Sequence, residues 1–181
     1  MTNKNFNEMI VHVPLCTHKE PANVLIIGNA DEDLKEQVAK HNYISNVQFG
    51  DETLLTSKNE KNVDVIIFTD VKPDELLLAN VQKVLKDEGV IALPSTSFFK
   101  DKEQLKADLK LIGEKFWITM PYKFDHETAI LASKRYHPTA DIVLQRSDLL
   151  DDLEYYSTEI QTACFVFPAA VHKELTGIAR R

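Results

Sequence analysis

The sequence predicts a three-layer α/β fold built around a mostly parallel β-sheet with an antiparallel edge. Continuous apolar runs such as Val24–Gly28 and Val63–Thr69 are typical of strands buried on both faces of a parallel sheet. Segments with helical periodicity separate these runs, which favours right-handed strand–helix–strand units. The later runs Phe116–Met120 and Thr128–Ala132 follow one another without a helix between them, so we expect an antiparallel pair.

The first half of the chain is expected to hold three strands and one helix. The first strand ends at a glycine, and Leu34 and Val38 lie one helical turn apart in the segment that follows. The third strand is the strongest apolar run of the chain and ends at Asp70. In order, the expected elements are the strand Val24–Gly28, the helix Asp33–His41, the strand Asn46–Phe49, which ends at Gly50–Asp51, and the strand Val63–Thr69.

The second half continues the alternation and ends in a helical tail. Asp74 is a suitable N-cap for the next helix, and Gly89 lies just beyond its expected end. The acidic run 148–152 is expected to be the solvated start of a further helix. In order, we expect the helix Asp74–Asp87, the strand Val90–Leu93, the helix Lys102–Phe116, the strands Phe116–Met120 and Thr128–Ala132 around an irregular connection, and the tail Leu149–Arg181, broken at Pro168.

Composition limits the classes of function. A chain of 181 residues fits one domain, with a leading segment at 1–22 and the tail at 149–181. The net charge of −7 argues against a nucleic-acid surface, and no apolar stretch approaches the ~18–20 residues of a membrane helix. Cys16 and Cys164 are the only cysteines, which favours reduced thiols in a cytoplasmic protein. The histidines and cysteines show no metal-ligand spacing.

Acidic residues follow three successive strands. Asp31 comes after the first strand, Asp51 after the second and Asp70 after the third. Ligands of parallel α/β sheets bind beyond the carboxyl ends of the strands, so these carboxylates could line a ligand cleft. The alternative is that they cap helices and fill turns, and Asp31 could do both.

Three stretches resemble the spermidine synthase (polyamine aminopropyltransferase) family. NFNEMIVHVPLCTHKEPANVLIIG at Asn5–Gly28 resembles the family pattern Y-[HQ]-E-M-x-x-H-x-P-L-x-x-H-x-x-P-x-x-V-L-I-I-G. VDVIIFTD at Val63–Asp70 resembles its D-V-I-I-x-D strand, and YYSTEIQTACFVFP at Tyr155–Pro168 resembles its Y-Y-N-x-[DE]-[IV]-H-x-A-x-F-x-L-P segment. The three stretches occur in the family's order and together span nearly the whole chain.

The resemblance implies both a fold and a reaction. The fold is the Rossmann-like fold of the S-adenosylmethionine-dependent methyltransferases. The reaction moves an aminopropyl group from decarboxylated S-adenosylmethionine, a co-substrate, to putrescine, giving spermidine and methylthioadenosine without a further cofactor or metal. An amine attacks a methylene next to a sulfonium, so a carboxylate should deprotonate or orient the amine, and an acidic cleft should hold the two cations together. The resemblance also implies a homo-oligomer, with a dimer expected.

The same resemblance assigns roles to individual residues. Asp70 falls on the aspartate that acts as the base for the attacking amine, and Asp31 on the aspartate that holds the aminopropyl ammonium. Asp74 lies one position late for the family's second aspartate, and Tyr122 takes the place of a substrate-pocket tyrosine. Asp51 aligns either with the acid that binds the ribose hydroxyls or with the turn that contacts adenine. His12 and His18 match the family and are expected to pack or cap.

The sequence also departs from the family pattern. The chain begins where the family's central domain begins, without the N-terminal β-domain, and residues 28–33 read G-N-A-D-E-D in place of G-G-G-D-G-G. The stretch between the first expected helix and Val63 is short for the usual two strands with a helix between them. Phe6, Asn7 and Gln161 also differ. The alternatives are therefore a truncated, catalytically impaired homologue that keeps the fold for adenosyl-ligand binding or assembly, or a small-molecule methyltransferase.

Overall fold

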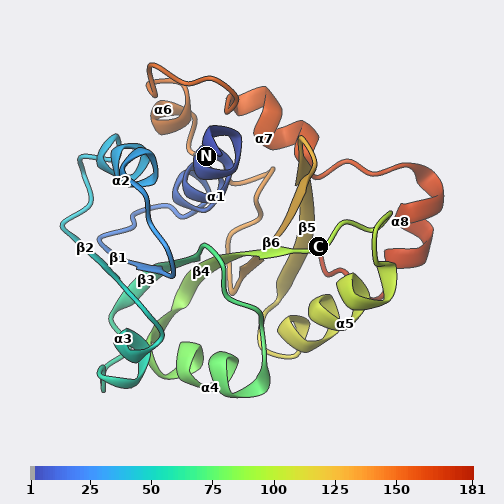
Figure 1. Cartoon of the computed structure of the whole chain (residues 1–181), viewed down its shortest axis with the longest axis horizontal. Coiled ribbons are helices and arrows are strands. Elements are labelled where there is room, and N and C mark those ends of the chain that lie inside the picture. The colour runs from blue at the N-terminus through green and yellow to red at the C-terminus, as the bar shows by residue number, and fades with distance from the viewer. Residues whose placement is uncertain (1–2) are drawn as a thin grey trace.

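The computed structural model describes residues 3–181 and shows three layers, with a six-stranded sheet in the middle (Figure 1). The strand order is β2-β1-β3-β4-β6-β5. The pairs of β1 with β2, β1 with β3 and β3 with β4 are parallel, whereas β6 runs antiparallel to both β4 and β5. This confirms the mostly parallel sheet with an antiparallel edge. The strands are β1 (Asn23–Ile27), β2 (Asn46–Gly50), β3 (Val63–Phe68), β4 (Leu85–Ser95), β5 (Ile118–Phe124) and β6 (Glu127–Ser133).

Helices cover both faces of the sheet (Figure 1). One face carries α1 (Lys4–Thr17), α2 (Glu32–Ala39), α6 (Leu144–Ser147) and α7 (Thr158–Cys164). The other face carries α3 (Thr53–Thr56), α4 (Glu75–Val84), α5 (Lys102–Gly113) and α8 (Ala169–Leu175).

Two hydrophobic cores result, one on each face of the sheet. Val24 and Ile26 of β1 pack into the core under α1, while Leu25 and Ile27 pack into the core over α4. Successive side chains of a strand point to opposite faces, so a strand covered on both sides is mostly apolar. This is why β1 and β3 read as continuous apolar runs. The buried exception in β3 is Asp64, whose carboxylate accepts two backbone N–H groups.

Helix α1 lies in the segment that the sequence analysis left without secondary structure. Asn3 caps it by accepting the N–H of Phe6, and every residue from Asn7 to Thr17 is buried. Pro14 lies inside the helix and removes one backbone donor, which lowers the local helix signal of the sequence. Burial against α2, β3 and β4 outweighs that local cost, since tertiary packing supplies most of the stability of a helix in a protein.

A buried polar chain joins α1 to α2 and confirms a packing role for His12. Nδ1 of His12 lies 2.8 Å from Nε2 of His41, and its Nε2 lies 3.1 Å from Oε1 of Gln37. Nδ1 of His41 lies 2.8 Å from the hydroxyl of Tyr43. His12 and His41 are 0% and 2% exposed. One set of neutral tautomers satisfies every contact, so the histidines act as uncharged links in the core.

The helix predicted at Asp74–Asp87 is shorter than expected. Asp74 caps it as predicted, but the helix ends at Val84 and β4 begins at Leu85. Leu85 pairs with Val63 of β3, and this non-local pairing draws the following residues into an extended strand. Gly89 therefore lies inside β4, and the prediction that it follows directly on the helix end was wrong.

Two further expectations in the second half were wrong. The irregular connection is a tight hairpin, because β5 runs to Phe124 and β6 begins at Glu127, with Asp125 at φ 50° in the turn. The acidic run 148–152 does not start a helix, since it follows α6 and the next helix, α7, begins at Thr158. The break at Pro168 is confirmed, with Pro168 as the N-cap residue of α8.

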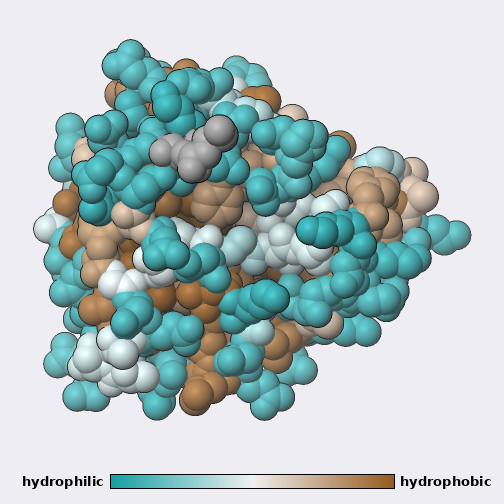
Figure 2. Space-filling model, viewed as in Figure 1, coloured by the Kyte–Doolittle hydropathy of each residue, from teal (hydrophilic) through white to brown (hydrophobic). Residues whose placement is uncertain are grey.

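Hydrophilic residues cover most of the face shown in Figure 2, with hydrophobic residues between them. Across residues 3–181 no helix is both long and apolar enough to cross a membrane.

Candidate functional site

The candidate site lies where the chain changes direction at the carboxyl ends of β1 and β3. After β1 the chain continues into α2 on one face of the sheet, and after β3 it continues into α4 on the other face. This divergence opens a crevice at the ends of the two neighbouring strands. A hollow of about 390 Å³ occupies this place. Its lining includes Gly28, Asn29, Gly50, Asp51, Thr53 and Asp70.

Gly28 brings the loop after β1 close to the loop after β3. Its φ of +114° is one that side-chain-bearing residues rarely adopt. A Cβ atom at this position would lie 2.1 Å from Oδ1 of Asp70 and 2.4 Å from Oγ1 of Thr69. The position therefore requires glycine both for its backbone conformation and for the space that the Asp70 carboxylate fills.

Asp70 borders two hollows. It follows β3, its residue is exposed, and its Oδ2 accepts a hydrogen bond of 2.6 Å from Nδ2 of Asn29. A second hollow of about 560 Å³ lies on its other side, between the loop after β4 and the β5–β6 turn. Because Asp70 lines both, it stands where ligands in the two hollows would meet.

Asp51 lies in the first hollow, after β2. Its Oδ1 accepts hydrogen bonds from the hydroxyl and the backbone N–H of Thr53. These bonds favour the ionised carboxylate and hold the pKa of Asp51 below its ordinary value. The structure thus brings together Asp51 and Asp70, two of the residues predicted from strand ends.

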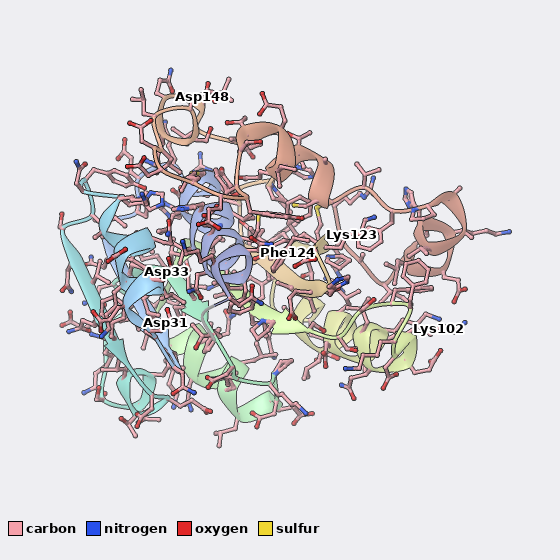
Figure 3. The ribbon with its side chains drawn as sticks, turned by 45° about the horizontal axis from the view of Figure 1, so that its top comes forward. Asp31, Asp33, Lys102, Lys123, Phe124 and Asp148 are labelled. Atoms are coloured by element: carbon pink, nitrogen blue, oxygen red, sulfur yellow. The ribbon has the colours of Figure 1, made fainter. Side chains whose placement is uncertain are left out.

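Asp31 lies outside the residues that line the two hollows. It is the N-cap of α2, and its Oδ1 accepts the N–H of Leu34 at 2.8 Å. The same oxygen accepts Nδ2 of Asn7 at 3.0 Å, and that nitrogen also lies 2.8 Å from Oδ2 of Asp33. Figure 3 shows Asp31 and Asp33 close together at the start of α2. The capping role foreseen for Asp31 is therefore confirmed.

The structure does not bring Asp74 or Tyr122 to these hollows. Asp74 is exposed, and its side chain accepts the N–H of Leu77 at 2.7 Å as the cap of α4. Tyr122 is 0% exposed, and its ring packs against Phe124 and Phe165. Within residues 3–181 its hydroxyl has no hydrogen-bond partner, and burial raises its pKa well above the ordinary value.

Asp108 is a lining residue that sequence reasoning missed. It is 7% exposed and lines the second hollow, where Oγ of Ser95 and Nε2 of Gln104 each donate to its carboxylate at 2.8 Å. The signal was available, because Asp108 interrupts the apolar stripe of α5 between Leu105 and Leu109. A carboxylate in such a stripe needs polar partners, which here come from the end of β4 and the preceding turn of α5.

Carboxylates outnumber cations around the second hollow. Its acidic lining residues are Asp70, Asp101, Asp108 and Glu127, and its basic ones are Lys72 and Lys100. A cleft with this balance favours a cationic ligand over an anionic one.

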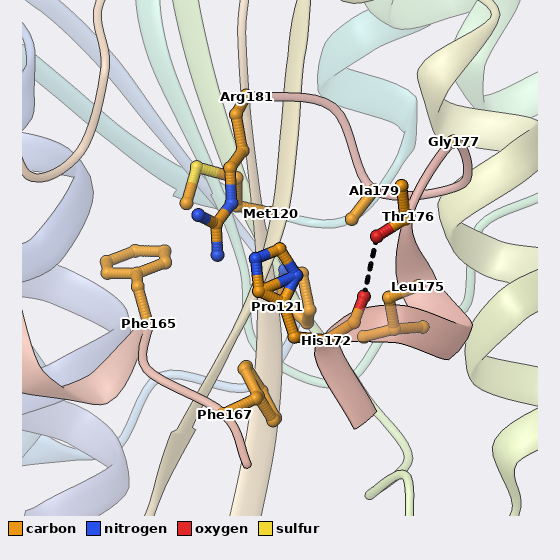
Figure 4. A pocket seen from close by; sticks show the side chains of 10 residues that line it. All are labelled: Met120, Pro121, Phe165, Phe167, His172, Leu175, Thr176, Gly177, Ala179 and Arg181. Atoms are coloured by element: carbon orange, nitrogen blue, oxygen red, sulfur yellow. Dashed lines mark hydrogen bonds between the residues drawn. The ribbon is translucent and has the colours of Figure 1, made fainter. Parts of the chain in front are cut away.

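A separate crevice of about 170 Å³ lies between β5 and the tail (Figure 4). Apolar side chains such as Met120, Phe165 and Phe167 line much of it, and the hydroxyl of Thr176 donates to the carbonyl oxygen of His172 at 2.9 Å. It contains none of the predicted site residues. The crevice is therefore a packing seam between the edge of the sheet and the tail.

Comparison with known proteins finds a matching family model and relatives named polyamine aminopropyltransferase. Residues 3–66 match the family described as the spermine/spermidine synthase domain. A polyamine aminopropyltransferase of Helicobacter acinonychis is 28% identical over 200 residues, covering 91% of this chain and 76% of the relative. One of Methanocaldococcus jannaschii is 26% identical over 210 residues, covering 89% and 72%.

Two solved structures share the fold. The crystal structure of spermidine synthase from Thermotoga maritima matches with a TM-score of 0.84 and 24% identity, covering 98% of this chain and 77% of that one. A spermidine synthase in complex with the transition-state analogue AdoDATO matches with a TM-score of 0.85 and 24% identity, covering 97% and 78%. The predicted Rossmann-like fold is therefore confirmed.

Proposed function

We infer the function from one premise, that this chain is a relative of the spermine/spermidine synthase family. We propose that it transfers an aminopropyl group from decarboxylated S-adenosylmethionine to a diamine such as putrescine, giving spermidine and methylthioadenosine. The observation that carries the proposal is the position of Asp70, which borders two adjoining hollows at the carboxyl ends of β1 and β3. One hollow would take the nucleoside and the other the amine.

The proposed reaction needs little more than positioning and one base. The acceptor amine gives a proton to the Asp70 carboxylate, because a protonated amine has no lone pair to attack with. The amine nitrogen then bonds to the methylene carbon next to the sulfonium, and the carbon–sulfur bond breaks with its electron pair left on sulfur. Methylthioadenosine leaves as a neutral thioether. The acidic lining of the second hollow would hold the cationic amine near this carbon.

We assign supporting roles to other residues as part of the same proposal. Asp51, ionised in the first hollow, would accept hydrogen bonds from the nucleoside, through either ribose or adenine. The negative charge of Asp31 would attract the aminopropyl ammonium while its side chain caps α2. Asp74 and Tyr122 would act through the scaffold, as the cap of α4 and as part of the core.

The proposal extends to organisation and location. The chain would act as one domain, with residues 1–22 leading into β1 and the tail 149–181 packing across the sheet. It would work in the cytoplasm, where the buried thiols of Cys16 and Cys164 stay reduced, with decarboxylated S-adenosylmethionine as co-substrate and no further cofactor. A homodimer is part of the same proposal.

A second candidate function is adenosyl-ligand binding without catalysis. The observation that favours it is that two of the carboxylates already accept hydrogen bonds from side-chain amides. The amide of Asn29 donates to Asp70, and the amide of Asn7 donates to Asp31. Under this alternative the fold would keep a nucleoside site while transfer of the aminopropyl group is impaired.

Calorimetric titration tests the proposed function. The chain is titrated separately with decarboxylated S-adenosylmethionine, S-adenosylmethionine and methylthioadenosine, and product formation is then followed with putrescine. We expect binding of the decarboxylated compound and of methylthioadenosine, followed by spermidine formation. Binding without spermidine would favour the second candidate, and binding of none of the three would refute both.

A further inference from the structure

The side chain of Asn29 spans the crevice between β1 and β3. Asn29 follows β1 and its residue is exposed, while Asp70 follows β3. The 2.6 Å bond from Nδ2 of Asn29 to Oδ2 of Asp70 joins the two loops. It crosses the place at which the two hollows adjoin, because Asn29 lines the first and Asp70 lines both.

The other oxygen of Asp70 faces the same loop. Oδ1 lies so near Gly28 that a Cβ there would approach it to 2.1 Å, and the hydroxyl of Thr69 lies 3.4 Å away. Both carboxylate oxygens are therefore directed toward the loop after β1. In this arrangement the Asn29 amide has to leave Oδ2 before an amine in the second hollow can bind that oxygen.

Backbone conformation does not account for asparagine at position 29. Among residues 3–181 the non-glycine residues with positive φ are Asp125 and Asp152, so Asn29 does not use its tolerance of the left-handed region. The start of α2 does not need it either, because Asp31 caps that helix. The hydrogen bond to Asp70 is the contact that uses the Asn29 amide.

We propose that Asn29 is a positioning residue that holds Asp70 in a closed state, and that a cationic amine entering the second hollow opens it. This inference rests on the proposed function, in which Asp70 is the base. An ammonium group competes well for Oδ2, since a hydrogen bond between two charged groups is stronger than one from a neutral amide. Asp70 is then released toward the amine only when an acceptor is present.

The test combines a spectroscopic readout with kinetics. The side-chain amide signal of Asn29 is assigned in the ¹H–¹⁵N spectrum by its loss in Asn29→Ala. We expect the signal to shift toward solvent-exposed values in Asp70→Ala and when putrescine is added to the unmodified chain. Asn29→Ala should lower the KM of putrescine about tenfold, because the entering amine no longer has to displace a hydrogen bond to a charged group.

Ala30→Gly is the matched control. It loosens the same loop but leaves the Asn29 amide in place, so the amide signal should stay where it is and the KM of putrescine should change less than in Asn29→Ala. A fall of equal size in the KM of putrescine in both variants would assign the effect to loop flexibility and overturn the proposal.

The remaining outcomes separate this inference from the proposed function. An Asn29 amide signal that moves neither in Asp70→Ala nor with putrescine overturns the closed state, whatever the chain catalyses. A KM of putrescine that Asn29→Ala leaves unchanged or raises also overturns it, while the proposed function stands. If neither the unmodified chain nor Asn29→Ala binds a nucleoside or makes spermidine, the proposed function fails. The closed state is then retained only if putrescine still moves the Asn29 amide signal.

Discussion

The carboxylate of Glu8 accepts a hydrogen bond of 2.8 Å from the backbone N–H of Tyr156, a residue 148 positions later in the chain. The N–H groups of Glu154 and Tyr155 donate to the same carboxylate at 2.8 Å each. Glu8 is 1% exposed, so the three donors replace the water that the carboxylate loses on burial. This contact fastens α1 to the segment that leads into α7.

Replacing Glu8 tests how much this contact stabilises the fold. We expect Glu8→Ala to lower the free energy of unfolding by about 3 kcal/mol, because it leaves one buried and two part-buried backbone donors without their acceptor. Urea denaturation of the variant and the unmodified chain measures the difference. Glu60→Ala, at an exposed position, should cost less than about 0.5 kcal/mol. Equal midpoints for the two variants would contradict the prediction.

Gly28→Ala tests the close approach of the two loops. We expect a loss of at least about 2 kcal/mol, since the new Cβ meets Asp70 at a φ of +114°. Gly177→Ala is the matched control, because its φ is +80° but nothing lies within 4 Å of the added Cβ. It should cost only the backbone strain, about 1 kcal/mol. A loss as large at Gly177 as at Gly28 would show that the contact with Asp70 adds nothing.

The buried histidines predict a loss of stability in mild acid. Burial lowers the pKa of His12 from 6.5 to about 4, that of His18 to about 4 and that of His41 to about 2. Their native pKa values lie below the unfolded value, so the unfolded chain binds more protons below pH 6.5. The stabilisation is therefore complete above pH 6.5 and declines as the pH falls toward 4, by up to about 1.4 kcal/mol per pH unit for each histidine.

Urea midpoints measured between about pH 7 and pH 4.5, roughly the window that these pKa values set, check this prediction. His12→Gln should reduce the slope of stability against pH, because it removes one group that the unfolded chain protonates. His172→Gln changes an exposed histidine and should leave the slope as it is. A slope that His12→Gln does not alter would count against a neutral buried His12.

Asp70→Asn tests the base of the proposed reaction. Asparagine keeps the size of the side chain but cannot take a proton from the amine, so turnover should fall by roughly 100-fold or more while nucleoside affinity stays largely unchanged. Steady-state kinetics and calorimetric titration measure the two effects. Asp87→Asn is the control, because Asp87 is exposed and pairs with Lys61 away from both hollows. Unchanged turnover in Asp70→Asn would remove Asp70 from the mechanism.

Local patterns predicted the parts of the fold in which burial is uniform. β1 and β3 are covered on both faces and were visible as apolar runs, and Asp74 was visible as a cap. Helix α1 was missed because Pro14 weakens its local signal, whereas its stability comes from packing against elements far along the chain. The start of β4 was missed because Leu85 becomes a strand residue only through its pairing with Val63.

The candidate site was predictable to the extent that strand ends determine it. Asp51 and Asp70 line the same hollow beside Gly28 because the carboxyl ends of parallel strands lie at the same edge of the sheet. The bond between Asn29 and Asp70 depends on the conformation of two loops, which no local pattern specifies. Tyr122 was misplaced for a similar reason, since the face of β5 to which it belongs turns toward Phe165 in the core.

The burial of α1 also has a consequence for the time at which the chain can fold during synthesis. The Glu8 carboxylate must wait for the backbone of Tyr156, which lies 148 residues later. At ~5–20 residues per second this delay is roughly 7–30 s. Until then the part of α1 that lies against residues 154–161 in the finished protein has no native cover. A nascent chain stalled before Tyr156 therefore leaves that part of α1 uncovered, while α2, β3 and β4 can already cover the rest.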